Sequence, residues 1–157
     1  LLDSLAIVPH IRGETIIDVG SGGGLPGIPL ALLFPAKRVT LLDSNGKKTR
    51  FLQHLKIQLQ LENVLIVQAR AEDFRGEFDV VTCRALASLS GIATLTAHML
   101  GSESRLLAMK GALSEGELAE DVSPLVIESV TPLPVPGVLV PRQLVVMSLA
   151  ARGATIP

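Results

Sequence analysis

Short runs of apolar and β-branched residues recur along the chain, separated by glycine, proline and charged positions. Runs of this length with few polar breaks are typical of parallel strands buried on both faces. Five such strands are predicted at residues 15–19, 37–43, 64–68, 78–83 and 105–109. Two further extended runs, at residues 125–133 and 143–149, predict an antiparallel pair at the end of the sheet.

Between the predicted strands, apolar residues recur at the three- and four-residue spacing of amphipathic helices. Helices are expected at residues 28–33, 46–56 and 86–100, with an acid-rich helical turn at 114–120. The apolar side of the second helix is expected to comprise Phe51, Leu52, Leu55 and Leu59. The alternation predicts an α/β fold in one domain, residues 1–157, with a mostly parallel, Rossmann-like seven-stranded sheet and helices on both faces.

The first nine residues are apolar at helical spacing, and the sequence does not open with methionine. They are expected to be the end of a helix whose start is missing. An N-terminal helical segment is therefore expected upstream of residue 1.

A glycine-rich loop, Gly20-Ser21-Gly22-Gly23-Gly24, follows the first predicted strand and precedes the first predicted helix. Backbone N–H groups point outward at a helix start, and glycines let a ligand approach the main chain. Pro29 is compatible with such a start, because its missing N–H costs little there. The combination predicts an anion or nucleotide site.

Two registers of this loop imply different cofactors. The dinucleotide fingerprint G-x-G-x-x-G fits Gly22, Gly24 and Gly27, although its first glycine then comes two residues late. The other register starts with Asp18 at the strand end and continues with glycines at positions 20, 22 and 24. It resembles the pattern of class I S-adenosylmethionine-dependent methyltransferases. A carboxylate there suits a ligand with an ammonium group and would repel a pyrophosphate, so this register is preferred.

Asp43 ends the second predicted strand, roughly 20 residues after the glycine loop. An acid at this place accepts hydrogen bonds from ribose hydroxyls. The alternative is that Asp43 caps the next helix, because Ser44 and Asn45 follow and a helix must begin nearby. With the glycine loop upstream, the ribose role is preferred.

Arg84 follows the fourth predicted strand, and ligands of open α/β sheets bind outside the carboxyl ends of strands. A surface arginine is the alternative. However, an idle charge between a buried strand and an apolar helix is costly. Arg84 is therefore expected to bind a carboxylate or phosphate, and the polar loop at residues 69–74 is expected to receive an adenine.

A basic cluster of Lys47, Lys48 and Arg50 lies near the start of the helix at 46–56, the end where the helix dipole favours anions. A cluster placed against this preference hints at phosphate contact, and a solvated helix face is the commoner explanation. The net charge of −1 argues mildly against a large polyanionic partner without excluding a local basic patch. Trp and Tyr are absent, and the four Phe residues are expected mostly in the core.

Cys83 is the single cysteine, which excludes an intramolecular disulfide and favours a reducing, cytoplasmic compartment. It is interpreted as a small buried hydrophobe rather than a nucleophile for cytosine C5 methylation. The three histidines, His10, His54 and His98, lack ligand spacing, so no metal is predicted. No apolar run reaches the length of a membrane span, and a monomer without a membrane partner is expected.

Six segments carry a closer resemblance: Asp3-Ser4-Leu5, Asp18 to Ala31, Leu41-Leu42-Asp43-Ser44, Lys47 to Leu52, Cys83-Arg84-Ala85 and Lys110-Gly111. Together they resemble the glucose-inhibited division protein B family, bacterial 16S ribosomal RNA guanine-N7 methyltransferases. The Leu25-Pro26-Gly27-Ile28-Pro29 continuation is far more specific than the glycines, and the likeness runs over nearly the whole chain. It implies the class I methyltransferase fold, S-adenosylmethionine as cofactor and 16S rRNA of the small ribosomal subunit as partner.

The same resemblance implies the site residues. Nucleoside contacts would fall on Gly20, Leu25, Ala71, Glu72 and Arg84. Asp18 and Asp43 match the two acids of the superfamily, with Gly22 and Gly24 in the loop between them. The candidate RNA contacts are Lys47, Lys48, Arg50, Lys110 and Arg142.

The implied target is a guanine in the decoding-region loop of 16S rRNA. Guanine N7 has a lone pair and no proton, so methyl transfer from a sulfonium requires alignment but no general base. No catalytic residue is assigned, which agrees with this chemistry. Two alternatives stay open: an NAD-dependent oxidoreductase using the dinucleotide register, and a non-catalytic nucleoside-binding regulatory module.

Overall fold

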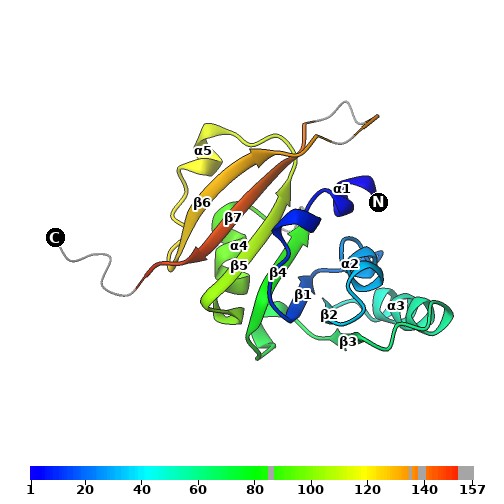
Figure 1. The fold of residues 1–157 in the computed structure, drawn as a ribbon. Helices are drawn as coiled ribbons and strands as arrows, with labels where there is room; N and C mark the ends of the chain where they lie inside the picture. Colours follow the sequence, from blue (N-terminus) through cyan, green and yellow to red (C-terminus); the bar gives the residue numbers. More distant parts are fainter. Residues whose placement is uncertain (85–86, 135, 138–140, 152–157) are drawn as a thin grey trace.

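The computed structural model describes residues 1–84, 87–134, 136–137 and 141–151. Within these ranges one sheet has the strand order β3-β2-β1-β4-β5-β7-β6 (Figure 1). The strands are β1 (Thr15–Val19), β2 (Arg38–Asp43), β3 (Val64–Gln68), β4 (Phe78–Arg84), β5 (Leu100–Lys110), β6 (Leu125–Pro132) and β7 (Gln143–Leu149). In this described sheet β7 pairs antiparallel with both β5 and β6, and the other paired strands are parallel. The predicted mostly parallel, seven-stranded sheet is confirmed.

Helices and single turns connect the strands. The helices are α1 (Leu2–Leu5), α2 (Gly27–Leu33), α3 (Gly46–Gln58), α4 (Leu89–Thr96) and α5 (Glu115–Leu118). The 3-10 turns are η1 (Val8–His10), η2 (Ala71–Asp73) and η3 (Ala97–Met99). The apolar N-terminal stretch thus forms a short helix and a 3-10 turn.

The core lies on both faces of the sheet, because side chains alternate along each buried strand. Ile16 and Ile17, neighbours in β1, are both fully buried but belong to different apolar clusters. The Ile16 cluster includes Leu30 of α2 and Leu52 of α3, whereas the Ile17 cluster includes Ile92 of α4. Helices therefore cover both faces, as predicted (Figure 1).

The helix predicted at residues 86–100 was too long. Its predicted start, Leu86, lies outside the described residues, and α4 begins only after Ser88, whose hydroxyl accepts a hydrogen bond from a backbone N–H at 3.3 Å. At the other end, Leu100 already belongs to β5 and pairs with Phe78 of β4. The apolar residues that end the helix and begin the strand run together in sequence, so periodicity alone does not separate them.

The expected apolar side of α3 was only partly right. Leu52 is fully buried, but Phe51 and Leu59 have exposed fractions of 48% and 43%. The helix packs on β2 and β3 near the edge of the sheet, where only a narrow stripe of it faces the core. Phe51 is therefore an outward-facing aromatic residue rather than a core residue.

Two other predicted features reach beyond the described residues: Ala85 in the motif after β4, and positions 135 and 138–140 in the loop between β6 and β7. Across the part of the chain that is described, no helix is both long and apolar enough to cross a bilayer.

Candidate functional site

A cavity of about 430 Å³ lies at the carboxyl ends of the parallel strands. The strand order turns in opposite directions from β1 and β4, and such a switch point is where doubly wound sheets bind ligands. The polar side chains that line the cavity are Asp43, Ser44, Lys48, Arg70, Glu72 and Arg84. The lining therefore mixes three cations with two carboxylates.

Asp43 is held rigidly at the end of β2. Its Oδ2 accepts a hydrogen bond from the Gly22 N–H and its Oδ1 one from the Asn45 N–H, each at 2.9 Å. Each carboxylate oxygen has further lone-pair capacity, so Asp43 can also accept ligand hydroxyls. The alternative of Asp43 as the cap of α3 is wrong, because that cap is Asn45, which accepts from the N–H groups of Lys47 and Lys48.

The backbone conformation of the glycine loop explains why glycines alternate in it. Gly20, Gly22 and Gly24 have φ values of +72°, +54° and +91°, a region that side chains with a Cβ rarely occupy. Gly20 lines the cavity directly. Gly22, Gly24 and Leu25 do not, so their expected contribution is to shape the loop.

Asp18 is turned into the protein, away from the cavity. Its side chain is 1% exposed, and its Oδ2 accepts a hydrogen bond from the Gly27 N–H at the start of α2, at 2.9 Å. Burial raises the pKa of this carboxyl to about 7, although the bonds from Gly27 and Thr82 oppose the shift. A Cβ on Gly27 would lie 2.8 Å from the same oxygen, which explains the glycine there.

Ala71 and Glu72 line the cavity from η2, directly after β3. The turn is held from outside by His98, whose Nε2 lies 3.0 Å from the carbonyl oxygens of both Ala71 and Phe74. Since two carbonyls only accept, this nitrogen carries the proton. The loop predicted to receive an adenine is thus fixed to η3.

Arg84 lines the cavity at the end of β4, and its side chain is 37% exposed. Its Nη2 lies 4.0 Å from Oδ2 of Asp3, and the Nε of Arg142 lies 3.7 Å from the same oxygen. At these distances Asp3 engages both arginines only weakly, and a guanidinium has five N–H donors. Arg84 therefore keeps donors for an anionic ligand group, whereas Arg142 lies outside the cavity lining.

Lys48 and Arg70 were not predicted to line this cavity. Lys48, expected on an RNA surface, lies instead among the cavity residues, one turn into α3 after Asp43. Arg70 lies two residues after the end of β3 and directly precedes Ala71 and Glu72, which were predicted to contact the nucleoside. Ligands of such sheets bind where the carboxyl ends of the strands meet. If this rule had been applied to every strand, it would have predicted Arg70 as a cavity residue.

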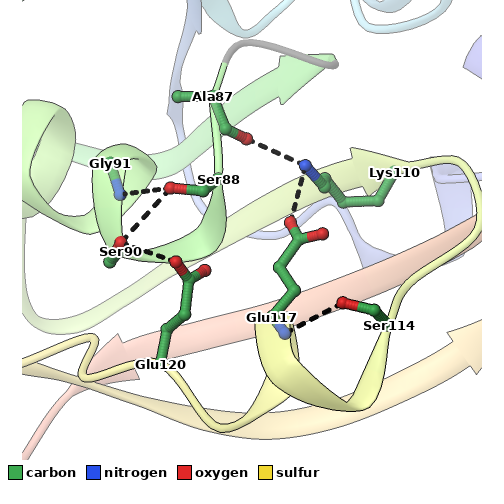
Figure 2. Close-up of polar contacts among 8 residues, drawn as sticks. All are labelled: Ala87, Ser88, Ser90, Gly91, Lys110, Ser114, Glu117 and Glu120. Atoms are coloured by element: carbon green, nitrogen blue, oxygen red, sulfur yellow. Dashed lines mark hydrogen bonds and ion pairs between the residues drawn. The ribbon is translucent and has the colours of Figure 1, made fainter.

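The charge of Lys110 is paired within the fold. Its Nζ lies 2.8 Å from Oε2 of Glu117 and 2.8 Å from the carbonyl oxygen of Ala87, and its side chain is only 13% exposed (Figure 2). This arrangement contradicts a role as a free surface cation. Lys110 therefore stabilises the fold and is not part of the proposed RNA surface.

Lys47 and Arg50 lie exposed on α3, beside the exposed ring of Phe51. Within the described ranges, neither cation has an ion-pair partner. The sequence of α3 contains no acid. This helix thus presents a positive surface with one aromatic residue next to the cavity residue Lys48.

Cys83 is fully buried, and burial raises the pKa of its thiol to about 12. A neutral buried thiol is a poor nucleophile, which agrees with its interpretation as a small hydrophobe. In the described part of the chain, no group of three or more His, Cys, Asp or Glu side chains is placed to hold a metal ion.

Comparison with known proteins gives a consistent result. Residues 1–146 match the family model described as GidB, rRNA small subunit methyltransferase G. The chain is 50% identical over 154 residues to the ribosomal RNA small subunit methyltransferase G of Pseudomonas paraeruginosa, covering 96% of this chain and 72% of the relative. It is 45% identical over 150 residues to the protein of the same name from Erwinia tasmaniensis, covering 94% and 73%.

Solved structures agree on the fold. A ribosomal protein L11 methylase from Lactobacillus delbrueckii subsp. bulgaricus superposes with a TM-score of 0.73 at 19% identity, covering 96% of this chain and 78% of that one. At this identity the likeness concerns the fold alone, and it confirms the predicted class I methyltransferase architecture. By the match over residues 1–146, this chain belongs to the rRNA small subunit methyltransferase G family.

Proposed function

We propose that this protein is an S-adenosylmethionine-dependent methyltransferase that methylates N7 of a guanine in the decoding-region loop of 16S rRNA. The observation that carries the proposal is the cavity at the switch point, with Asp43 fixed on one wall and Arg84 on another. Membership in the rRNA methyltransferase family supports the reaction and its RNA substrate. Such a protein would act as a monomer in the bacterial cytoplasm.

The donor set of the cavity fits the proposed cofactor. Asp43 would accept the ribose hydroxyls, and η2, with Ala71 and Glu72, would hold the adenine. Arg84 would bind the carboxylate of the methionine part, with Lys48 adding positive charge. The chemistry that the cofactor supplies when bound is an electrophilic methyl group on a positively charged sulfur.

The described lining of the cavity contains no histidine and no cysteine. N7 as the acceptor requires neither, because that nitrogen attacks through an existing lone pair and loses no proton. The protein would then accelerate transfer by aligning the nucleophile, the methyl carbon and the sulfur, which can lower a barrier by about 7–11 kcal/mol.

The RNA would approach over α3. Lys47 and Arg50 would contact phosphates, and the exposed Phe51 would stack on an unpaired base. Phosphate contacts position a nucleic acid without reading its sequence, so these residues would set affinity rather than the choice of guanine. Arg142, which is half-buried and lies outside the cavity lining, stays a candidate RNA contact.

The direct test is incubation of the protein with methyl-labelled S-adenosylmethionine and 30S subunits from cells lacking the protein. We expect labelled methyl groups in 16S rRNA, and we expect excess unlabelled S-adenosylmethionine to reduce this labelling. Calorimetric titration with NAD serves as the control for the dinucleotide register. Binding of NAD in preference to S-adenosylmethionine, or cofactor binding with no label in RNA, would support an alternative function.

A further inference from the structure

Residues 87–90, which we call the segment after β4, are held by Lys110, which is paired with Glu117 of α5, and by Glu120 (Figure 2). Lys110 connects Glu117 to the Ala87 carbonyl through two contacts of 2.8 Å each. Further along the segment, Ser90 donates a hydrogen bond from its hydroxyl to Oε2 of Glu120 at 3.1 Å. We call these contacts of Lys110, Glu117 and Glu120 the α5 clasp.

The residues of the clasp are anchored by the sheet and by a capped helical turn. Lys110 ends β5 and pairs through its backbone with Gln143 of β7. Glu117 belongs to α5, whose first turn is capped by Ser114 through a bond from the Glu117 N–H at 3.0 Å. The side chains of Lys110 and Glu117 are only 13% and 20% exposed, so water competes weakly with their contact.

The clasped segment is bracketed by cavity residues. Arg84, just before it, and Leu95 of α4, after it, both line the cavity. The backbone of Arg84 is fixed independently, because it pairs with Met109 in the β4–β5 ladder. The clasp therefore acts on the part of the cavity wall beyond the strand end, and much less on the strand end itself.

We propose that the α5 clasp holds the segment after β4 in the position that methyl transfer requires, so that Lys110, Glu117 and Glu120 are positioning residues. The inference rests on the proposed function. Loss of the clasp should impair transfer more than cofactor binding, because Asp43 and the backbone of Arg84 are held by contacts outside the clasp. A misplacement of about 1 Å in a reacting assembly can cost about a hundredfold in rate.

The test compares Lys110→Met with Lys110→Arg, which keeps a cationic donor for both partners. Lys110→Met is expected to lower kcat on 30S subunits at least tenfold, with the Kd for S-adenosylmethionine changed less than twofold. Lys110→Arg is expected to recover most of kcat. Glu115→Gln is the matched control, because Glu115 is an exposed acid of the same helical turn, and it should behave as wild type.

Hydrogen exchange supplies a second readout. The amides of residues 88–91 should exchange faster in Lys110→Met, whereas those of β1 should not. If Lys110→Met does not fold, Ser90→Ala removes one clasp contact and should still lower kcat about threefold at unchanged melting temperature. Wild-type kcat in both variants, or equal losses of kcat, cofactor affinity and melting temperature, would overturn the positioning role. An inactive wild type would instead overturn the proposed function.

Discussion

The two parts of the sheet support the cavity in different ways. In the parallel part, β3-β2-β1-β4, acids at strand ends bind backbone N–H groups of nearby loops, as Asp43 binds Gly22 and Asn45. In the antiparallel part, β5-β7-β6, the charged side chain of Lys110 reaches out of the sheet to support the segment after β4. The first part forms most of the cavity proposed to bind the cofactor, and the second is proposed to hold the wall of that cavity beyond the end of β4.

A second contrast lies inside the parallel part. Asp18 and Asp43 lie at or next to the ends of neighbouring strands and match the same superfamily pattern, yet only Asp43 lines the cavity. Asp18 is buried and serves the helix start through Gly27. One acid of the motif therefore stabilises the fold, whereas the other faces the cavity proposed to bind the cofactor.

The largest expected effect tests the inward position of Asp18. Its folded pKa, about 7, lies above the usual value of 3.8 for an aspartate, so its contribution to stability is fully present below pH 3.8 and is lost as the pH rises through 7. The free energy of unfolding of wild type, minus that of Asp18→Asn, should fall by about 4 kcal/mol over this range. Urea unfolding at several pH values measures it, and a pH-independent difference would contradict the burial account.

Asp43→Ala should weaken S-adenosylmethionine binding about a hundredfold, roughly 2.7 kcal/mol. The variant removes the ribose acceptor and leaves two backbone N–H groups without partners. Calorimetry measures the change. Asp73→Ala is the matched control, since Asp73 is an exposed acid of η2 that does not line the cavity, and an equal loss there would count against the assignment of Asp43.

Arg84→Ala should weaken cofactor binding at least tenfold, about 1.4 kcal/mol. The physical reason is loss of a charge-assisted bond to the cofactor carboxylate. Arg142→Ala provides the comparison, because Arg142 approaches the same Asp3 oxygen but lies outside the cavity lining. Unchanged affinity in Arg84→Ala would remove Arg84 from the cofactor site.

The smallest expected effect concerns the surface of α3. Replacing Lys47 and Arg50 together by Ala should weaken binding to 30S subunits about fivefold and flatten its dependence on salt, because two phosphate contacts are lost. Cofactor affinity should stay within twofold, since neither side chain lines the cavity. Lys56→Ala, near the other end of α3, is the control. A parallel loss of cofactor affinity would show that α3 itself had moved.

The sequence allowed much of the parallel part to be predicted, because its signals are local. Thr15–Val19 and Val64–Gln68 were predicted with the observed bounds, since glycine or polar residues flank each apolar run. The alternating glycines reported backbone conformations that few other residues adopt. Both patterns reflect a local requirement, namely the burial of a strand or a backbone with positive φ.

Other features depended on packing that no local pattern records. The inward turn of Asp18 is set by the start of α2, and the exposure of Phe51 by the place of α3 near the sheet edge. Lysine is usually a surface residue. Lys110 contacts Glu117 and the Ala87 carbonyl only because the folded chain brings α5 and residue 87 together around it. Its role could therefore not be predicted from its identity or its position in sequence.

The most direct test of the central claim is to locate the methyl group on the RNA. 16S rRNA from 30S subunits treated with this protein and S-adenosylmethionine would be reduced and then cleaved with aniline, which breaks the chain at N7-methylated guanine. The account predicts one new cleavage in the decoding-region loop, present with wild type and strongly reduced with Asp43→Ala. Methylation at another atom, or no cleavage despite bound cofactor, would contradict it.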